Sequence, residues 1–375
     1  MKNSPPVFSG LLLVLIFSRA VPATARSYDM YRADFEKGAF CSAIGGACAS
    51  DDDLENGFFQ NPAALAVHEH YWNFDGDYAA SSNLEPGMKV TQEAKEARFM
   101  FGAGFSRENW GYGFSITSRK DQSGSALPVH DRNGNPGTTS LAMKNSLSLF
   151  NLAAGHKLTS RLFAGVGLTA MFFDQDLGLS SPAAINSGRR GAFPALAVTI
   201  GVIDAGSKSF RAGSWLRTSL VFHNKVRLAS GSFSQPVDYR ENMAVRLPWM
   251  LASGISYMPW ADARTIFFDV NVIGNTPAGY QLTDDAFAGV LSDRRLRSKG
   301  RTVSLEPRLG YRTPWSAKSR VTLLTGGYYE TGRWDGLPGR LHFTGGAALR
   351  TFTWLELMGG FDVAKNFFQL FLTFR

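Results

Sequence analysis

Two groups of residues in this chain could do chemistry by their types and spacing, and the first is His68-Glu69-His70. Residues two apart lie on one face of a strand, so His68 and His70 would point the same way. Imidazole is a common zinc ligand, but a zinc site needs at least three protein ligands at defined places. The sequence offers no third ligand at a fixed spacing. We therefore interpret these residues as solvated side chains at a strand end, and expect no metal and no cofactor.

The second group consists of charged residues and one histidine on the polar faces of predicted strands. Such residues could support acid–base catalysis, but no nucleophile stands out beside them, so we expect no enzyme. Charges of both signs on one inward face predict a hydrogen-bonded ion network inside the fold. The residues expected in this network are Arg98, Asp269, Glu306, Arg308, His342, Arg350 and Glu356.

The elements that position these residues are strands in which every second residue is apolar. Trp110, Tyr112, Phe114 and Ile116 alternate with small or polar residues, and the chain closes on a similar run from Phe368 to Phe374. Period-2 alternation is the pattern of a strand with two different faces. One face carries bulky apolar residues and the other small or charged ones, as in a barrel surrounded by lipid. The sequence therefore predicts an all-β, transmembrane antiparallel β-barrel.

About fourteen alternating segments can be counted, joined by connections that are short on one side and long on the other. Short turns are typical of the periplasmic end of an outer-membrane barrel and long loops of the outer end. Residues 119–145 and 225–248 are expected to be long loops, and the final strand is expected to close the barrel against the first near Tyr71. The expected strands are 71–79, 96–105, 110–118, 146–155, 161–173, 191–202, 214–224, 249–258, 264–273, 302–312, 319–330, 341–350, 353–363 and 366–374.

Three local features carry further expectations. Pro307 lacks a ladder donor and predicts a bulge, and the break in alternation between Leu149 and Phe150 indicates either a bulge or a wrongly assigned strand. Cys41 and Cys48 are the only cysteines, and the sequence leaves open whether they pair across a small loop or stay free. Tryptophans near strand ends are expected to lie in interfacial girdles. These tryptophans are Trp215, Trp260, Trp315, Trp334 and Trp354.

Composition and the N-terminus indicate export. Lys2, the apolar run from Leu11 to Phe17, and Ala23-Thr24-Ala25 together predict a cleavable signal peptide over residues 1–25. No later apolar segment is long enough for a helical membrane span. The formal net charge is +8, but the basic residues are scattered, so we expect no nucleic-acid binding. We expect the mature chain in the bacterial outer membrane, in contact with lipid and lipopolysaccharide and inserted by the barrel-assembly machinery.

Between the signal peptide and the first strand lies a segment that does not alternate. It holds a small-residue run from Gly38 to Ala49, acidic residues at Asp51 to Asp53, the pair Phe58-Phe59, and Asn61-Pro62-Ala63 before Leu65. This order of features resembles the N-terminal hatch of the FadL family, the outer-membrane channels for long-chain fatty acids and other hydrophobic molecules. The resemblance implies a hatch over residues 26–66 inside a barrel over residues 67–375.

The resemblance also implies a function. In the family, hydrophobic ligands bind inside the barrel and leave sideways beside a kinked strand. Gly111 and Gly113 are the local candidates for such a kink, although they are equally explained as room for the hatch. The residues expected to gate the hatch are Phe58, Phe59, Asn61, Pro62 and Ala63.

The expected function is therefore passive uptake of hydrophobic small molecules, of the long-chain fatty acid or hydrocarbon class. PorV-like barrels share the hatch pattern and serve in secretion. The alternative function is accordingly that of a docking or secretion-accessory barrel whose extracellular loops bind a protein partner.

Overall fold

The computed structural model of this chain contains one large antiparallel sheet. Within the described residues the sheet has seventeen strands, and a separate hairpin is formed by β13 and β14. Three pairs of strands, β6–β7, β8–β9 and β10–β11, are successive parts of one interrupted strand each, so the wall is crossed fourteen times. The structure describes residues 37–375 except 52–53, 68–69, 82–92, 131–135, 182–183, 189–194, 208, 231–237, 260–263, 275–278, 282–295, 299–300, 317–318, 333–338, 353 and 366.

The helical elements precede all of the strands. They are α2 (Ala39–Ala43), α3 (Leu54–Phe59) and the 3-10 helix η3 (Pro62–Ala66). The strands are β1 (His70–Ser81), β2 (Glu93–Arg107), β3 (Trp110–His130), β4 (Pro136–Lys157), β5 (Leu162–Ser181), β6 (Ala184–Gly188), β7 (Ala195–Asp204), β8 (Phe210–Arg217), β9 (Leu220–Ser230), β10 (Asp238–Leu247), β11 (Met250–Tyr257), β12 (Thr265–Ile273), β13 (Gly279–Gln281), β14 (Leu296–Ser298), β15 (Ser304–Pro314), β16 (Val321–Glu330), β17 (Arg340–Phe352), β18 (Leu355–Ala364) and β19 (Phe367–Phe374).

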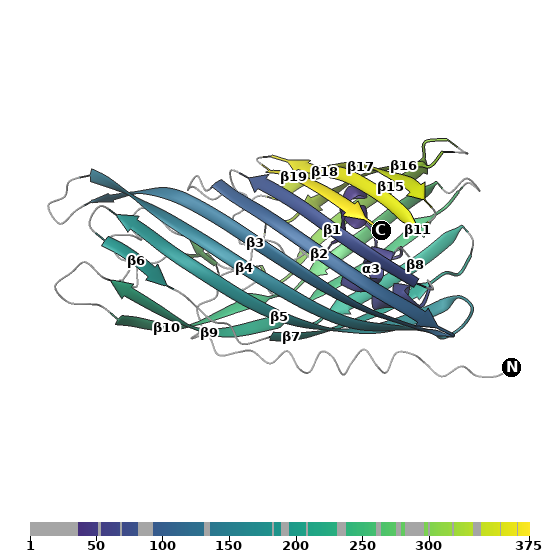
Figure 1. Cartoon of the computed structure of the whole chain (residues 1–375), viewed down its shortest axis with the longest axis horizontal. Coiled ribbons are helices and arrows are strands. Elements are labelled where there is room, and N and C mark those ends of the chain that lie inside the picture. The colour runs from purple at the N-terminus through teal and green to yellow at the C-terminus, as the bar shows by residue number, and fades with distance from the viewer. Residues whose placement is uncertain are drawn as a thin grey trace.

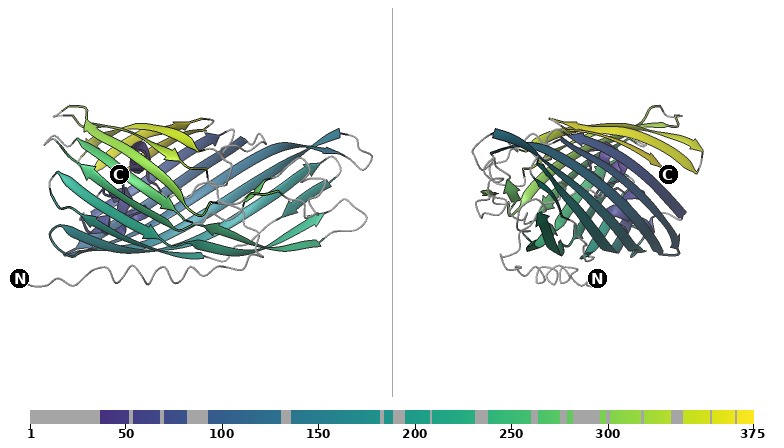
Figure 2. Two further views of the ribbon diagram at one scale, coloured as in Figure 1. Left: turned by 180° about the vertical axis from the view of Figure 1, so that it is seen from behind. Right: turned by 60° about the vertical axis from the view of Figure 1, so that its left-hand side comes forward.

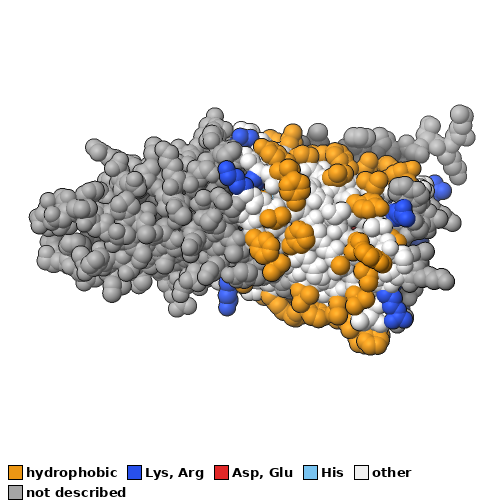
Figure 3. All heavy atoms as spheres, turned by 90° about the horizontal axis from the view of Figure 1, so that it is seen from above, with side chains coloured by type: hydrophobic (Ala, Val, Ile, Leu, Met, Phe, Trp, Pro, Cys, Tyr) orange, Lys and Arg blue, Asp and Glu red, His pale blue; other side chains and the backbone are white. Residues whose placement is uncertain are grey.

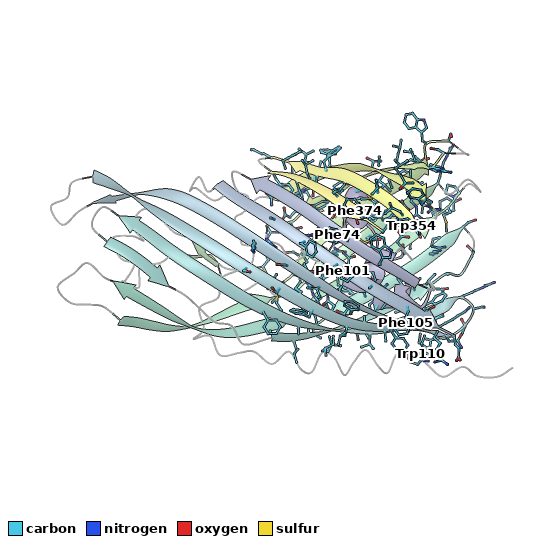
Figure 4. All side chains as sticks on the ribbon, in the orientation of Figure 1. Phe74, Phe101, Phe105, Trp110, Trp354 and Phe374 are labelled. Carbon is cyan, nitrogen blue, oxygen red and sulfur yellow. A yellow bond between two sulfur atoms is a disulfide. The ribbon has the colours of Figure 1, made fainter. Side chains whose placement is uncertain are left out.

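The sheet closes on itself because the last strand pairs with the first. β1 and β19 form a continuous antiparallel ladder from Phe74–Phe374 to Ser81–Phe367. The rings of Phe74 and Phe374 meet edge to face across this seam, with centroids 6.1 Å apart (Figure 4). The predicted closure is confirmed, with the paired part of β1 starting three residues beyond Tyr71. A closed barrel leaves no unpaired edge strand, which is what lipid requires of a sheet.

The outer surface of the described wall is apolar. In β19, Phe368, Leu370 and Leu372 point outward, while the residues between them are buried inside. Figure 3 shows hydrophobic side chains spread over this wall, with lysines and arginines near its edges. An apolar band bordered by charge matches a barrel that sits in lipid. No helix in the described part of the chain is long and apolar enough to cross a membrane.

Several strands continue well past the predicted ends. Residues 119–145, expected as a loop, are largely strand, because β3 extends to His130 and β4 begins at Pro136 (Figure 1). Residues 225–248 were likewise expected as a loop, but they contain the end of β9 and all of β10, which pair along their length. Both predictions were wrong for one reason. Alternation marks a strand only where apolar residues recur at every second position over several residues, and these segments are rich in polar and turn-forming residues that interrupt it.

The two predicted bulges are also absent from the described ladders. The β12–β15 register runs through Pro307 without a shift, and the β15–β16 ladder begins one residue later, at Arg308. The missing donor of Pro307 therefore interrupts no ladder. The β4 register is equally regular past Leu149 and Phe150. Leu149 points inward and Phe150 outward, so the break in alternation reflects an apolar residue on the inner face.

The hatch, of which residues 37–51 and 54–66 are described, lies inside the barrel (Figure 2). Its first part is α2, followed by a turn in which Gly45 and Gly46 have φ of 68° and 71°, values that favour glycine. A disulfide joins Cys41 to Cys48 around this turn, which answers the question that the sequence left open. The predicted signal peptide, residues 1–25, lies outside the described residues.

The outward position of Leu370 leads to a first prediction. Replacing Leu370 by Arg puts a charge into the apolar band and should lower the free energy of unfolding in phospholipid bilayers by about 2–4 kcal/mol. The measurement is a reversible urea titration in liposomes, with Leu370→Met as the control. Equal stability of the two variants would contradict a lipid-facing Leu370.

The disulfide leads to a second prediction. Its loop spans a sequence separation of 7, and removing a crosslink of this size by the double change Cys41→Ala and Cys48→Ala costs about 2–3 kcal/mol. Because the bond constrains the hatch alone, amide exchange should accelerate at Gly46, whose N–H bonds Cys41 O, and stay slow in β16. Hydrogen exchange with mass spectrometry measures both. Unchanged exchange at Gly46 would show that the turn is held by its other contacts.

Candidate functional site

The hatch backbone lies directly against the inner wall wherever the wall carries glycine. A Cβ at Gly111 would collide with the carbonyl of Leu65, and a Cβ at Gly201 would collide with the side chain of Asn61. Glycine is thus required at these positions to let the two segments approach. β3 pairs with β2 and β4 without a register shift, so Gly111 and Gly113 make room for the hatch and the described β3 has no kink. The described wall glycines at which an added Cβ would meet the hatch are Gly102, Gly111, Gly113, Gly155, Gly165, Gly201, Gly213, Gly310, Gly326 and Gly346.

Asn61 connects the hatch to the wall through its side-chain amide. Its Nδ2 donates to Ala49 O at 3.0 Å within the hatch and to Val202 O at 3.2 Å on β7. Its Oδ1 accepts from Ala63 N at 3.2 Å, which caps η3, and Pro62 occupies the first turn of that helix. The three residues of the Asn-Pro-Ala motif thus form one buried joint between hatch and barrel.

Ala49 is held on both sides of its backbone. Its N–H donates to Oδ2 of Asp269 on β12 at 2.6 Å, while its carbonyl accepts from Asn61. Asp269, predicted as part of a lumen network, therefore binds the hatch itself. A similar bond runs from Oγ1 of Thr344 on β17 to Ala43 O at 2.9 Å.

A second set of contacts involves the aromatic ring of Phe40 in α2. The guanidinium of Arg375, the last residue of the chain, lies 4.8 Å from the ring centroid, and that of Arg312 lies 5.5 Å from it. Arg312 also pairs with Asp51 of the hatch at 3.5 Å. Cation–π contacts of this kind tie the start of the hatch to strands β15 and β19.

The inner wall formed by β16, β17 and β18 carries a buried polar cluster. Nδ1 of His342 lies 2.8 Å from Oδ1 of Asp362 and its Nε2 lies 3.1 Å from Oε2 of Glu330. Arg340 also pairs with Glu330, and the hydroxyl of Tyr328 donates to Asp362 at 2.7 Å. Both nitrogens of His342 are taken up by carboxylates, which leaves neither for a metal ion. The cluster therefore has the composition of a structural ion network.

The predicted network residues fall into separate groups. Arg308 and Glu306 pair directly at 2.6 Å on β15, close to the cluster around His342. Arg350 differs from the expectation: its side chain is 68% exposed and faces Glu356, which also pairs with Arg375. Arg350 and Glu356 lie at the short-turn end of the barrel. A residue there can have the alternation of an inward-facing position and still be exposed to solvent. Arg98 is buried on β2, beside Arg119 on β3.

Sequence reasoning missed Tyr328 and the three other charged members of the cluster, Glu330, Arg340 and Asp362. Glu330 ends β16 and Arg340 begins β17, where alternation gives no face because the strand stops. Asp362 has the right parity on β18, between outward Phe361 and Val363, and this signal could have identified it. The ion pair between Glu330 and Arg340 cannot be predicted until the end of β16 and the start of β17 are known.

The opposite part of the inner wall carries one largely apolar row between polar ones, with buried Arg98 and Arg119 on its outer side and Ser115 and Asn151 on the side of the hatch. Met100, Thr117, Leu149, Met171 and Ala195 are cross-strand neighbours on β2, β3, β4, β5 and β7, and all but Thr117 are apolar. All five are buried on the inner face. They lie one step closer to the long-loop end than the glycines that touch the hatch. The hatch therefore has a largely apolar row above it on this side.

Phe58 of α3 connects the hatch to this row. Its ring packs with Leu65 and Met100 in one buried cluster and lies over Gly102 and Gly113. The side chain of Phe59 lies outside the described residues. Among the expected gate residues, Phe58 is thus in contact with the largely apolar row, whereas Asn61 is fixed by hydrogen bonds.

A further apolar cluster faces inward from β8, β11 and β12. Trp215 belongs to it, together with Met250, Ala252, Ile273 and Ala49 of the hatch. Trp215 was expected in an interfacial girdle, and that prediction was wrong because its ring is buried on the inner face. Trp315 and Trp354 are exposed at the short-turn end, as expected of girdle residues, and Trp260 and Trp334 lie outside the described residues.

A closed antiparallel barrel with fourteen crossings and a helical N-terminal hatch inside it has the fold of the FadL-type outer-membrane channels for hydrophobic compounds. The resemblance seen around Asn61 is confirmed at the level of the fold. The matched solved structures are transport channels.

The chain is similar to the toluene transporter TbuX of Ralstonia pickettii, with a TM-score of 0.67, 12% identity, and 90% of this chain and 98% of that chain covered. It is also similar to the toluene transporter TodX of Pseudomonas putida, with a TM-score of 0.61, 13% identity, and coverage of 93% and 99%. A FadL homologue of Pseudomonas aeruginosa matches with a TM-score of 0.62, 8% identity, and coverage of 90% and 97%. Neither a protein-family model nor a curated protein matches the sequence.

The joint at Asn61 leads to a third prediction. Asn61→Ala removes the bonds to Ala49 and Val202 and leaves buried carbonyls unpaired, which costs about 1–3 kcal/mol. The population of unseated hatch should rise roughly tenfold or more. Single-channel recording in planar bilayers should show correspondingly more frequent openings. Asn109→Ala, in an exposed turn, is the control and should conduct like the unmodified protein. Equal opening frequencies for both variants would contradict the role given to Asn61.

Proposed function

We propose that this protein is a bacterial outer-membrane channel through which hydrophobic small molecules pass without an energy source or cofactor. The cargo class is that of long-chain fatty acids or hydrocarbons. The fold supports a channel, and toluene is named for two of the structural neighbours. At 12% and 13% identity the substrate of those proteins cannot be assigned to this chain. The cargo class is inferred instead from the inner wall of this barrel.

The observation that carries the proposal is the largely apolar row of the inner wall above the hatch. Inward-facing positions of a water-filled barrel are usually polar. Here Met100, Leu149, Met171 and Ala195 lie in one buried cross-strand row that only Thr117 interrupts, and Phe58 of the hatch packs against its edge. A ligand that lies along this row would replace apolar contacts of Phe58 with its own, at little cost in free energy.

The contacts of the hatch support release from one side. Toward β12 and β15–β19 it is held by directional bonds to Asp269, Thr344, Arg308 and Arg312. Toward β2 and β3 its described packing is that of Phe58 and Leu65 against Met100 and glycines. Apolar packing is non-directional and is the easier of the two to exchange for a ligand. We therefore expect α3 to move first when a hydrophobic molecule arrives from the outer end.

A docking or secretion-accessory barrel is the competing function. Such a barrel needs only a sealed lumen, and polar side chains would seal it as well as apolar ones. The row from Met100 to Met171 is not explained by docking, so uptake is the better interpretation of the inner wall.

The fourth prediction tests uptake directly. Cells of a Gram-negative host without its own hydrophobic-compound channel should take up radiolabelled oleate or toluene faster when they produce this protein. Leu149→Glu places a charge in the apolar row and should reduce the rate to that of the empty host, because burying an unpaired carboxylate beside the ligand path is costly. Leu149→Met is the matched control and should retain the rate.

Folding of each variant is checked by its heat-dependent shift in gel electrophoresis. Uptake by the unmodified protein equal to that of the empty host, for both cargoes, would overturn the channel proposal and favour docking.

A further inference from the structure

The indole nitrogen of Trp215 is buried without a hydrogen-bond partner. The side chain is 4% exposed, and among the residues that the structure describes nothing accepts a hydrogen bond from Nε1. Buried tryptophans usually find an acceptor for this N–H, and an exception calls for an explanation such as a missing water or ligand. The N–H of Trp215 thus forms no hydrogen bond to the described barrel wall or to the described hatch.

The surroundings of Trp215 are those of a binding surface for an apolar molecule. Met250, Ala252 and Ile273 line the same inward cluster, and all three are buried. On β8, Trp215 pairs with Gly201 on one side and with Ala252 on the other, so its ring stands between small residues. An apolar surface with one unpaired polar group is the usual composition of a small-molecule site.

The site lies between the wall and the hatch. Ala49 of the hatch packs in the same cluster as Trp215, and Ser50 lies against Gly213, two residues before Trp215 on the same inward face. The hydroxyl of Ser50 is also buried without a partner in the described structure. Two unpaired polar groups, one from the wall and one from the hatch, thus border a single apolar cluster.

From this geometry we infer that Trp215 is a specificity residue which pairs with one acceptor oxygen of the cargo, so that the channel favours neutral hydrophobic molecules carrying a carbonyl or ether oxygen over plain hydrocarbons. The inference rests on the proposed channel function and specifies its ligand class. An acceptor is required because an indole N–H can only donate. The contact does not require a charged head group, because the indole N–H is a neutral donor.

The same contact would connect ligand binding to the hatch. Ala49 packs in the same cluster as Trp215 and is the residue held by Asp269 and Asn61, so we expect a ligand that reaches Nε1 to disturb the packing of Ala49. Binding of the acceptor oxygen would therefore weaken the attachment of the hatch at Ala49. A plain hydrocarbon has the apolar contacts available but gains no hydrogen bond in exchange.

The test compares two ligands of nearly equal shape, acetophenone and ethylbenzene, which differ in a single acceptor oxygen. The dissociation constant of each radiolabelled compound is measured for the full chain in nanodiscs, with empty nanodiscs subtracted. Trp215→Phe keeps an aromatic ring and removes the N–H. The preference for acetophenone should be roughly three- to tenfold smaller in this variant, while the affinity for ethylbenzene changes less than about twofold.

Trp110→Phe, on the outward face, is the matched control and should leave the preference unchanged. If Trp215→Phe does not fold, benzothienylalanine at position 215 removes the N–H and keeps the shape of the indole. An identical preference with and without the N–H would overturn the inference and leave the channel proposal standing. Failure of both compounds to bind any variant would contradict the channel proposal as well.

Discussion

The close approach of the hatch backbone to the barrel wall is the contact on which the rest of the structure depends. It is possible only because the wall presents hydrogen atoms at positions such as Gly111 and Gly201, where any side chain would collide with the hatch. The same approach brings Ala49 within reach of Asp269 and Asn61 within reach of Val202. A barrel of this width would otherwise enclose water, so the glycines convert a pore into a filled interior.

The two sides of that interior hold the hatch by different kinds of contact. Toward β12 and β15–β18 the inner face is charged, and the charges neutralise one another or bind the hatch, as around His342. Toward β2–β5 the inner face is mixed, with a largely apolar row from Met100 to Met171, and the described contact of the hatch there is the packing of Phe58 and Leu65. An interior that was charged throughout would exclude hydrophobic molecules, and one that was apolar throughout would not hold the hatch in a fixed position. The division between the two sides gives the hatch directional attachment on one side and packing that is easier to exchange on the other.

The outer face of the barrel was largely readable from the sequence and the inner face was not. Lipid demands apolar residues at every outward position, so alternation in β19 or β12 reports the strand and its orientation at once. The inner face is shaped by the hatch and by ligands, which alternation does not record. Leu149 was therefore taken for a bulge and Trp215 for a girdle residue, although both are inward apolar residues. Strand β10 was missed although Met243, Val245 and Leu247 alternate in its second half, because the polar run from Arg240 to Asn242 precedes them.

The contact between Phe40 and Arg375 joins residues at opposite ends of the described chain. Such a contact cannot form until every strand has been synthesised and the seam between β1 and β19 has closed. The hatch, although it leaves the ribosome first, is thus one of the last parts to reach its final position. Contacts this distant in sequence slow folding, because the entropy of closing the whole chain is lost before they contribute. Until then the buried residues of the hatch, such as Phe40 and Phe58, lack part of the wall against which they pack.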